Sequence, residues 1–158
     1  MENGGSEMKS TFEGHLFGDK VIPADLLAEV QQAIVNANVK LGNGSAPNIR
    51  TAILGGLVAK GWSGEVALSS NSEITITSVK SKIGLCLQTG NVSRMYADLM
   101  KLQKLYVDEA IIAGIVIVPS APCAKKIGSN VANSVRLSKE LKIFERVITA
   151  PLVIFSME

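Results

Sequence analysis

The spacing of apolar residues divides the chain into helical and extended segments. Apolar side chains recur every three or four positions in residues 23–40 and 47–60, which predicts two amphipathic helices at the start of the fold. A turn rich in glycine separates them at residues 42–47. Residues 1–17 are polar, so we expect a flexible N-terminal segment there, followed by a single domain over residues 18–158.

The rest of the chain predicts a hairpin followed by alternating helices and strands. The expected strands cover residues 73–80, 83–88, 111–118 and 148–155, and the expected helices cover residues 92–106 and 129–147. Pro151 falls inside the last strand, which suggests that this strand lies near an edge or a bulge. This order predicts an α/β domain with a mixed sheet of about four to five strands, flanked by helices on both faces.

Composition narrows the class of protein only a little. A net charge of +2 neither indicates nor excludes DNA binding, although local clusters of lysine carry more information. The two cysteines lack metal-ligand spacing, and no apolar run reaches the roughly 20 residues of a membrane span. We therefore expect a cytoplasmic protein with reduced thiols, no membrane contact and no cofactor. The single histidine, His15, lies in the polar N-terminal region and is expected at the surface.

Gln88 is the one strongly polar residue of the apolar strand over residues 83–88. A polar side chain at the end of a buried strand usually faces a site or a hydrogen-bond partner, because leaving it unpaired costs about 1–3 kcal/mol. Gln88 is therefore the first candidate for a functional residue.

The same region resembles a known family. A strand with a Val-Lys hairpin, an apolar strand ending in Leu-Gln, and the segment Gly-Asn-Val-Ser-Arg-Met-Tyr-Ala-Asp-Leu-Met-Lys-Leu-Gln resemble the nuclease core of the BglII/BstYI restriction endonucleases. These are relatives of BamHI in the PD-(D/E)XK superfamily. The segments at residues 113–119 and 144–155 continue the resemblance, which runs from near Glu73 to the end of the chain.

The resemblance implies a restriction-endonuclease-like fold and metal-assisted phosphodiester hydrolysis. In that family an Asp on the first strand and a Glu on the second hold Mg²⁺, and a Gln two residues after the Glu points to the same side. These positions fall on Thr77, Cys86 and Gln88, of which only Gln88 matches. Magnesium requires hard oxygen ligands, so a hydroxyl and a neutral thiol do not replace carboxylates. Thr77 is also an ordinary strand former, and Cys86 an ordinary core residue.

Glu65 and Glu73 are the candidates for displaced metal-binding acids. On a regular strand Glu73 would lie roughly 13 Å from Thr77, too far to replace it directly, whereas Glu65 could reach the site from an adjoining element. Carboxylates at such positions are more often solvated strand-end charges. Lys80 and Lys82 alternate in the hairpin beside the expected site and are the best candidates for phosphate contacts.

Three functions remain open at this point. The first is a DNA-associated, restriction-endonuclease-like protein that has lost cleavage because its metal-binding positions are Thr77 and Cys86. The second is an active Mg²⁺-dependent endonuclease that uses Glu65 or Glu73 with Gln88. The third is a dimeric protein-interaction or regulatory module without DNA binding. In the resembled family the helices before the sheet help to build a homodimer, so we expect one here through the two N-terminal helices; alternatively, their apolar faces simply pack on the sheet.

Overall fold

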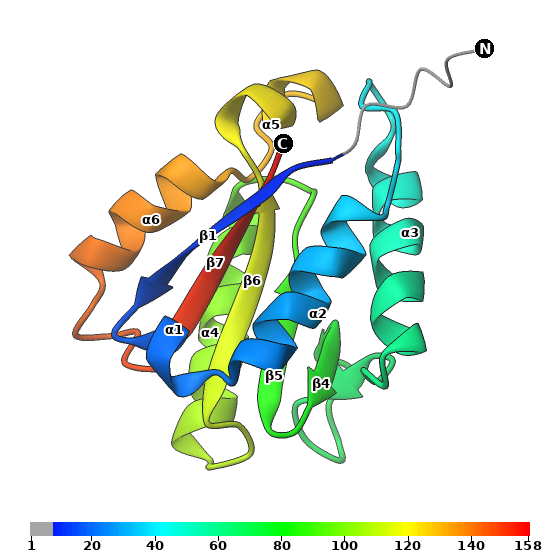
Figure 1. Cartoon of the computed structure of the whole chain (residues 1–158). Coiled ribbons are helices and arrows are strands. Elements are labelled where there is room, and N and C mark those ends of the chain that lie inside the picture. Colours follow the sequence, from blue (N-terminus) through cyan, green and yellow to red (C-terminus); the bar gives the residue numbers. More distant parts are fainter. Residues whose placement is uncertain (1–7) are drawn as a thin grey trace.

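The computed structural model describes residues 8–158, which form an α/β fold around a five-stranded sheet (Figure 1). The strands are β1 (Ser10–His15), β2 (Val66–Ala67), β3 (Thr75–Ile76), β4 (Ser78–Lys80), β5 (Ile83–Leu87), β6 (Ala113–Pro119) and β7 (Leu152–Met157). The helices are α1 (Gly18–Val21), α2 (Ala24–Val35), α3 (Ala46–Ala59), α4 (Ser93–Val107), α5 (Ala121–Ile127) and α6 (Ser134–Ile143).

The sheet has the order β1-β7-β6-β5-β4. Its three inner strands β5, β6 and β7 are parallel, and the two edge strands β1 and β4 are antiparallel to their neighbours. All residues of β5, β6 and β7 are buried, as expected for parallel strands that are covered on both faces. The predicted mixed sheet of four to five strands is confirmed. β2 and β3 form a separate two-stranded sheet.

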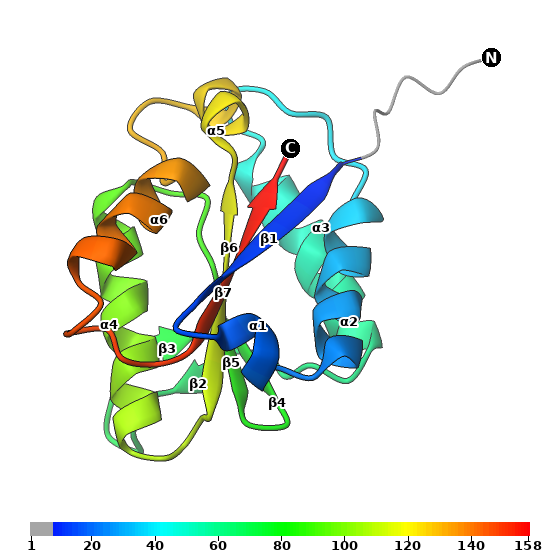
Figure 2. The same cartoon turned by 60° about the vertical axis from the view of Figure 1, so that its left-hand side comes forward.

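Helices cover both faces of the sheet (Figure 2). On one face, α2 and α3 contribute Ile34 and Ile53 to a core that includes Ile115 and Phe155. On the other face, α4 and α6 pack residues such as Leu102 and Leu137 against alternate strand positions, among them Val116 and Ile154. Neighbouring strand residues point to opposite faces, so one apolar strand contributes side chains to both cores. No helix in the described part of the chain is long and apolar enough to span a membrane.

The apolar faces of the two N-terminal helices are covered within the chain. Leu26, Val30 and Ile49 are buried in the core beneath the helices. A Cβ at Gly56 would lie 3.2 Å from the Cβ of Ala33, so Gly56 allows α3 to approach α2 closely. The alternative reading, in which these faces pack on the sheet, accounts for the apolar pattern. The homodimer through these helices stays a prediction.

The expectation of a flexible segment through residue 17 is wrong for residues 10–15. These residues form β1, which pairs antiparallel with β7 from Ser10 opposite Met157 to His15 opposite Leu152. Residues 1–7 lie outside the described residues. His15 is buried instead of lying at the surface, and its Nε2 lies 2.8 Å from the carbonyl oxygen of Ile148. The hydrogen-bonded edge of β7 orders this polar segment, which has no strong apolar pattern of its own.

Two further predictions concern the C-terminal part of the chain. The helix expected over residues 129–147 is shorter, because only α6 (Ser134–Ile143) lies in this range and a loop precedes it. The side chain of Asn133 caps the first turn of α6 by accepting from the N–H of Arg136 at 3.0 Å. The last strand, β7, is not an edge strand itself but lies next to the edge strand β1, between β1 and β6. Pro151 precedes β7, and its carbonyl accepts a hydrogen bond from the N–H of Gly114 at 3.0 Å. Because Pro151 lies before the strand begins, its missing N–H does not interrupt the hydrogen bonds of β7.

Candidate functional site at the end of strand β5

A cavity of about 530 Å³ opens where β5 ends. It lies between residues of α3, the β2–β3 region and α4. Its polar and charged lining includes Arg50, Glu65, Thr77, Cys86, Gln88, Arg94, Asp98 and Lys101. The structure therefore brings together the three positions that the resemblance singled out, along with one of the two displaced acids.

Thr77 lies at the break between β3 and β4, where the chain passes from the small sheet to the main one. Its side chain is buried, and its hydroxyl oxygen accepts a hydrogen bond from the backbone N–H of Leu87 at 3.1 Å. The hydroxyl thus satisfies a strand N–H that would otherwise be unpaired at this point. Thr77 therefore stabilises the end of β5 from the position where the resemblance predicted a carboxylate.

Cys86 is buried on β5, with 2% of its surface exposed. Burial raises the pKa of its thiol far above the ordinary range, and the nearby charge of Asp98 acts in the same direction. The side chain is therefore a neutral thiol at neutral pH. A neutral thiol is a poor nucleophile and a poor metal ligand.

Gln88 has the hydrogen-bond partner that the sequence led us to expect. Its side-chain nitrogen Nε2 donates to Oδ2 of Asp98 at 2.7 Å, and its Oε1 accepts from the N–H of Gly90 at 3.0 Å. Both ends of the amide are thus engaged within the chain. These contacts fix the orientation of the amide at the wall of the cavity.

Asp98 is a site residue that the sequence analysis missed. It lies on α4 with 6% of its surface exposed, and burial raises the pKa of its carboxyl, opposed by Gln88, Lys101 and Arg50. A signal was present, because Asp98 follows Met95 by three residues and precedes Leu102 by four, on the apolar stripe of the helix. A carboxyl group on the buried face of a helix requires a partner.

Three cationic side chains also line the cavity. Arg50 on α3 donates from Nη1 to the carbonyl of Leu87 at 3.0 Å. Lys101 on α4 has its Nζ 3.7 Å from Oδ1 of Asp98. Arg94 lies beside Gly90, where a Cβ would come within 3.4 Å of its Nη1. None of these three residues was among the candidate site residues from the sequence.

The residues at the positions that the resemblance assigned to the metal do not fit magnesium. The hydroxyl of Thr77 and the Oε1 of Gln88 are held by backbone N–H groups, and Cys86 is a neutral thiol. Glu65 lines the cavity but is exposed, and Glu73 is exposed and lies outside the lining. Within residues 8–158 no group of three or more His, Cys, Asp and Glu side chains could hold a metal ion. The donors lack the charge that a hard cation requires.

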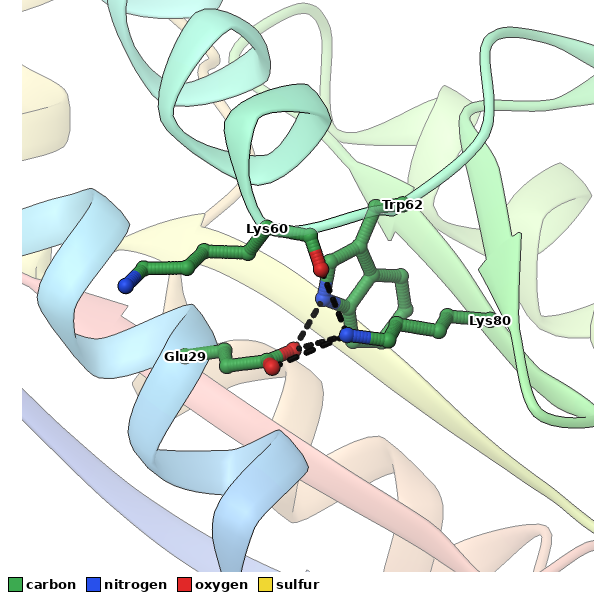
Figure 3. A network of polar contacts seen from close by, with 4 residues as sticks. All are labelled: Glu29, Lys60, Trp62 and Lys80. Carbon is green, nitrogen blue, oxygen red and sulfur yellow. Dashed lines mark hydrogen bonds and ion pairs between the residues drawn. The ribbon is translucent and has the colours of Figure 1, made fainter.

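Lys80 does not line the cavity and takes part in a polar network with Glu29, Lys60 and Trp62 (Figure 3). Its Nζ lies 2.9 Å from both carboxyl oxygens of Glu29 and 2.5 Å from the carbonyl oxygen of Lys60. The indole N–H of Trp62 donates to the same carboxylate at 2.9 Å. This pairing lowers the pKa of Glu29. Lys80 therefore ties β4 to α2 through its ion pair with Glu29, and a phosphate contact of Lys80 stays a prediction.

Lys82 is exposed, but it lies at the other end of β5 from the cavity. The hairpin turn at Ser81 and Lys82 precedes β5, whereas Gln88 follows it. Six residues of extended chain separate Lys82 from Gln88, which corresponds to roughly 20 Å. The two lysines were expected beside the site because they are close to it in sequence. Because β5 runs from the hairpin toward the cavity, the two lysines lie at the opposite end of this strand from the cavity.

Comparisons with known proteins agree with this architecture. The family described as restriction endonuclease BglII/BglIII matches residues 11–157. The crystal structure of BglII complexed with a DNA 16-mer is similar with a TM-score of 0.82 and 12% identity, covering 94% of this chain and 75% of that chain. The structure of free BglII gives a TM-score of 0.72 and 14% identity, covering 94% and 78%. The search of curated proteins gives no match. This chain belongs to the BglII/BglIII restriction endonuclease family and has its α/β fold.

Proposed function

We propose that this protein is a DNA-associated member of the family that does not cleave DNA. The observation that carries the proposal is the state of the family's metal positions. Thr77 and Cys86 replace the two acids, and the polar atoms of Thr77 and Gln88 are engaged in contacts within the chain. The proposal covers the cavity at the end of β5 and its three cations.

Loss of cleavage follows from the chemistry of phosphodiester hydrolysis. A bound metal polarises the phosphoryl oxygen and lowers the pKa of the attacking water. A hydroxyl and a neutral thiol do not supply the charge that would hold such a metal. The remaining buried acid, Asp98, has a raised pKa and accepts a hydrogen bond from Gln88. The ligand set of a hydrolytic centre is therefore missing at these positions.

Association with DNA is supported by the charge of the cavity and by the family. Arg50, Arg94 and Lys101 converge on the cavity from α3 and α4. Arginine and lysine are the side chains that bind phosphate most readily, arginine through its planar fork of N–H donors. A similar protein, BglII, has been crystallised in complex with a DNA 16-mer. Lys82 stays a predicted phosphate contact outside the cavity.

A salt titration of DNA binding tests this proposal. We expect the affinity for duplex DNA to fall as salt rises, with a log–log slope that is about 0.9 units shallower for each phosphate contact removed. Arg50→Gln, Arg94→Gln and Lys101→Gln should each flatten the slope, whereas Lys126→Gln, which removes an exposed charge away from the cavity, should not. DNA binding that is absent or independent of salt would overturn the proposal and favour a protein-interaction role.

One observation favours a second candidate function, an active nuclease with displaced acids. Glu65 lines the same cavity as Asp98, so two carboxyl groups reach this space from different elements. Mg²⁺-dependent cleavage that is abolished by Glu65→Gln would establish this candidate. Glu73→Gln is the matched control, because Glu73 is exposed and lies outside the cavity.

A further inference from the structure

We infer that the cavity at the end of β5 is a metal-independent phosphate site, in which Arg50 and Lys101 supply the positive charge that a divalent cation supplies elsewhere. The inference rests on the proposed function and names its ligand, a single phosphate group of a DNA strand. It makes the cavity an anion site built from side chains.

Arg50 supplies the first cation from the α3 side. Its Nη1 donates to the carbonyl of Leu87, the last residue of β5, at 3.0 Å. This bond holds the guanidinium at the end of the strand, where it lines the cavity. A guanidinium carries several N–H donors in a fixed plane, so a contact with one carbonyl leaves donors for an anion.

Lys101 supplies the second cation from the opposite side, on α4. Its Nζ lies 3.7 Å from Oδ1 of Asp98, a distance longer than a hydrogen bond. About a quarter of the Lys101 side chain is exposed, at 26%. The ammonium therefore forms an ion pair with Asp98, and its N–H donors can point toward a ligand in the cavity.

Gly90 lines the cavity, and its lack of a side chain leaves space beside Gln88 and Arg94. A Cβ at this position would lie 2.9 Å from Oε1 of Gln88 and 3.4 Å from Nη1 of Arg94. The missing side chain lets the third cation, Arg94, approach the backbone beside Gln88. The cavity of about 530 Å³ is large enough for a phosphate group with part of its sugar.

The charges around the cavity favour an anion over a cation. Three cations, Arg50, Arg94 and Lys101, line it together with two acids, Glu65 and Asp98. Asp98 is also the acid whose pKa is raised by burial, which reduces its hold on a cation. A divalent metal entering this space would meet fixed positive charge on both sides, whereas a phosphate would be attracted by it.

Calorimetric titration with inorganic phosphate tests the inference. We expect the full-length protein to bind phosphate with the same affinity in EDTA and in Mg²⁺. Arg50→Gln and Lys101→Gln should each weaken binding by about tenfold or more, which is about 1.4 kcal/mol each. Lys126→Gln removes an exposed charge outside the cavity and should leave the affinity unchanged. Arg50→Lys provides a second, milder variant that keeps the charge, and it should retain part of the affinity.

Several results would overturn the inference. They are the absence of phosphate binding, phosphate binding that requires Mg²⁺, and a loss of affinity in Lys126→Gln equal to that in Arg50→Gln and Lys101→Gln. A parallel measurement with duplex DNA separates this inference from the proposed function. DNA binding that phosphate does not compete with would overturn the phosphate site and leave the proposed function standing. Phosphate binding without DNA binding would overturn the proposed function and leave the site standing.

Discussion

The side-chain nitrogen of Gln88 donates to the carboxyl group of Asp98 across 2.7 Å and so joins the end of β5 to helix α4. The other end of the same amide accepts from the N–H of Gly90 at 3.0 Å. Gln88, which the resemblance placed beside a metal, is therefore a bridge between two elements. The bridge joins two of the elements that line the cavity.

Asp98→Asn should change how stability depends on pH. Burial raises the pKa of Asp98 in the folded state, so between its ordinary pKa and the raised one the folded protein binds more protons than the unfolded chain. Stability contributed by the protonated group is therefore lost as pH rises through that window. We expect the free energy of unfolding of Asp98→Asn, measured in urea, to increase relative to that of the wild type as pH rises through this window.

Glu145→Gln is the control for this comparison. Glu145 is exposed, so its replacement should leave the pH dependence of unfolding close to that of the wild type. If Asp98→Asn and the wild type differed by a constant amount at every pH, the assignment of a raised pKa to Asp98 would be wrong.

Thr77→Asp with Cys86→Glu should create a binding site for Mg²⁺. The double variant places carboxyl groups at the two positions that the resemblance singled out, which line one cavity from the break between β3 and β4 and from β5. Two carboxylates are the usual protein contribution to a magnesium site. We expect calorimetry to detect Mg²⁺ binding in the double variant, and none in Thr77→Asn with Cys86→Gln. A folded double variant without Mg²⁺ affinity would contradict the assignment of these two positions.

Glu29→Ala should destabilise the fold without weakening DNA binding. The change leaves the N–H of Trp62, which is 2% exposed, without its acceptor and Lys80 without its ion pair. An unsatisfied buried donor costs about 1–3 kcal/mol, which urea unfolding can measure. Glu145→Ala is the control and should change stability by less than about 0.5 kcal/mol. A loss of DNA affinity in folded Glu29→Ala protein would show that the network also serves the site.

Gly90→Ala should disturb the cavity through Gln88. The added methyl would lie 2.9 Å from Oε1 of Gln88, which is held by Asp98 and Gly90 and does not move away freely. We expect a loss of about 1–3 kcal/mol in the free energy of unfolding. Gly55→Ala has no atom within 4 Å of its new methyl and lies in α3, so it should stabilise by up to about 1 kcal/mol. Equal effects of the two changes would contradict the crowding at Gly90.

The sequence predicted the parts of this structure that depend on local pattern. The apolar run over β5 and the alternation of helices and strands gave the mixed sheet, because burial on both faces demands uninterrupted apolar residues. Gln88 could be found for the same reason, as a polar interruption that needs a partner. The resemblance added Thr77 and Cys86, which the fold brings to one cavity.

The sequence could not supply what depends on pairing between distant segments. β1 is held by its hydrogen bonds to β7, which lies more than a hundred residues later in the chain. The pairing of Lys80 with Glu29 depends on how α2 and β4 come together in the fold, so charge alone suggested a phosphate contact. Arg50 reaches the cavity because α3 lies over the end of β5, a relationship that no spacing in the sequence encodes.

The most direct test of the central claim combines binding and cleavage in one experiment. Supercoiled plasmid is incubated with excess protein in Mg²⁺, in Mn²⁺ and in EDTA, and each sample is analysed for retarded mobility before, and for strand breaks after, the protein is removed. Our account predicts retarded DNA that remains supercoiled under all three conditions. Nicked or linear plasmid that appears with metal and is absent in EDTA would contradict it.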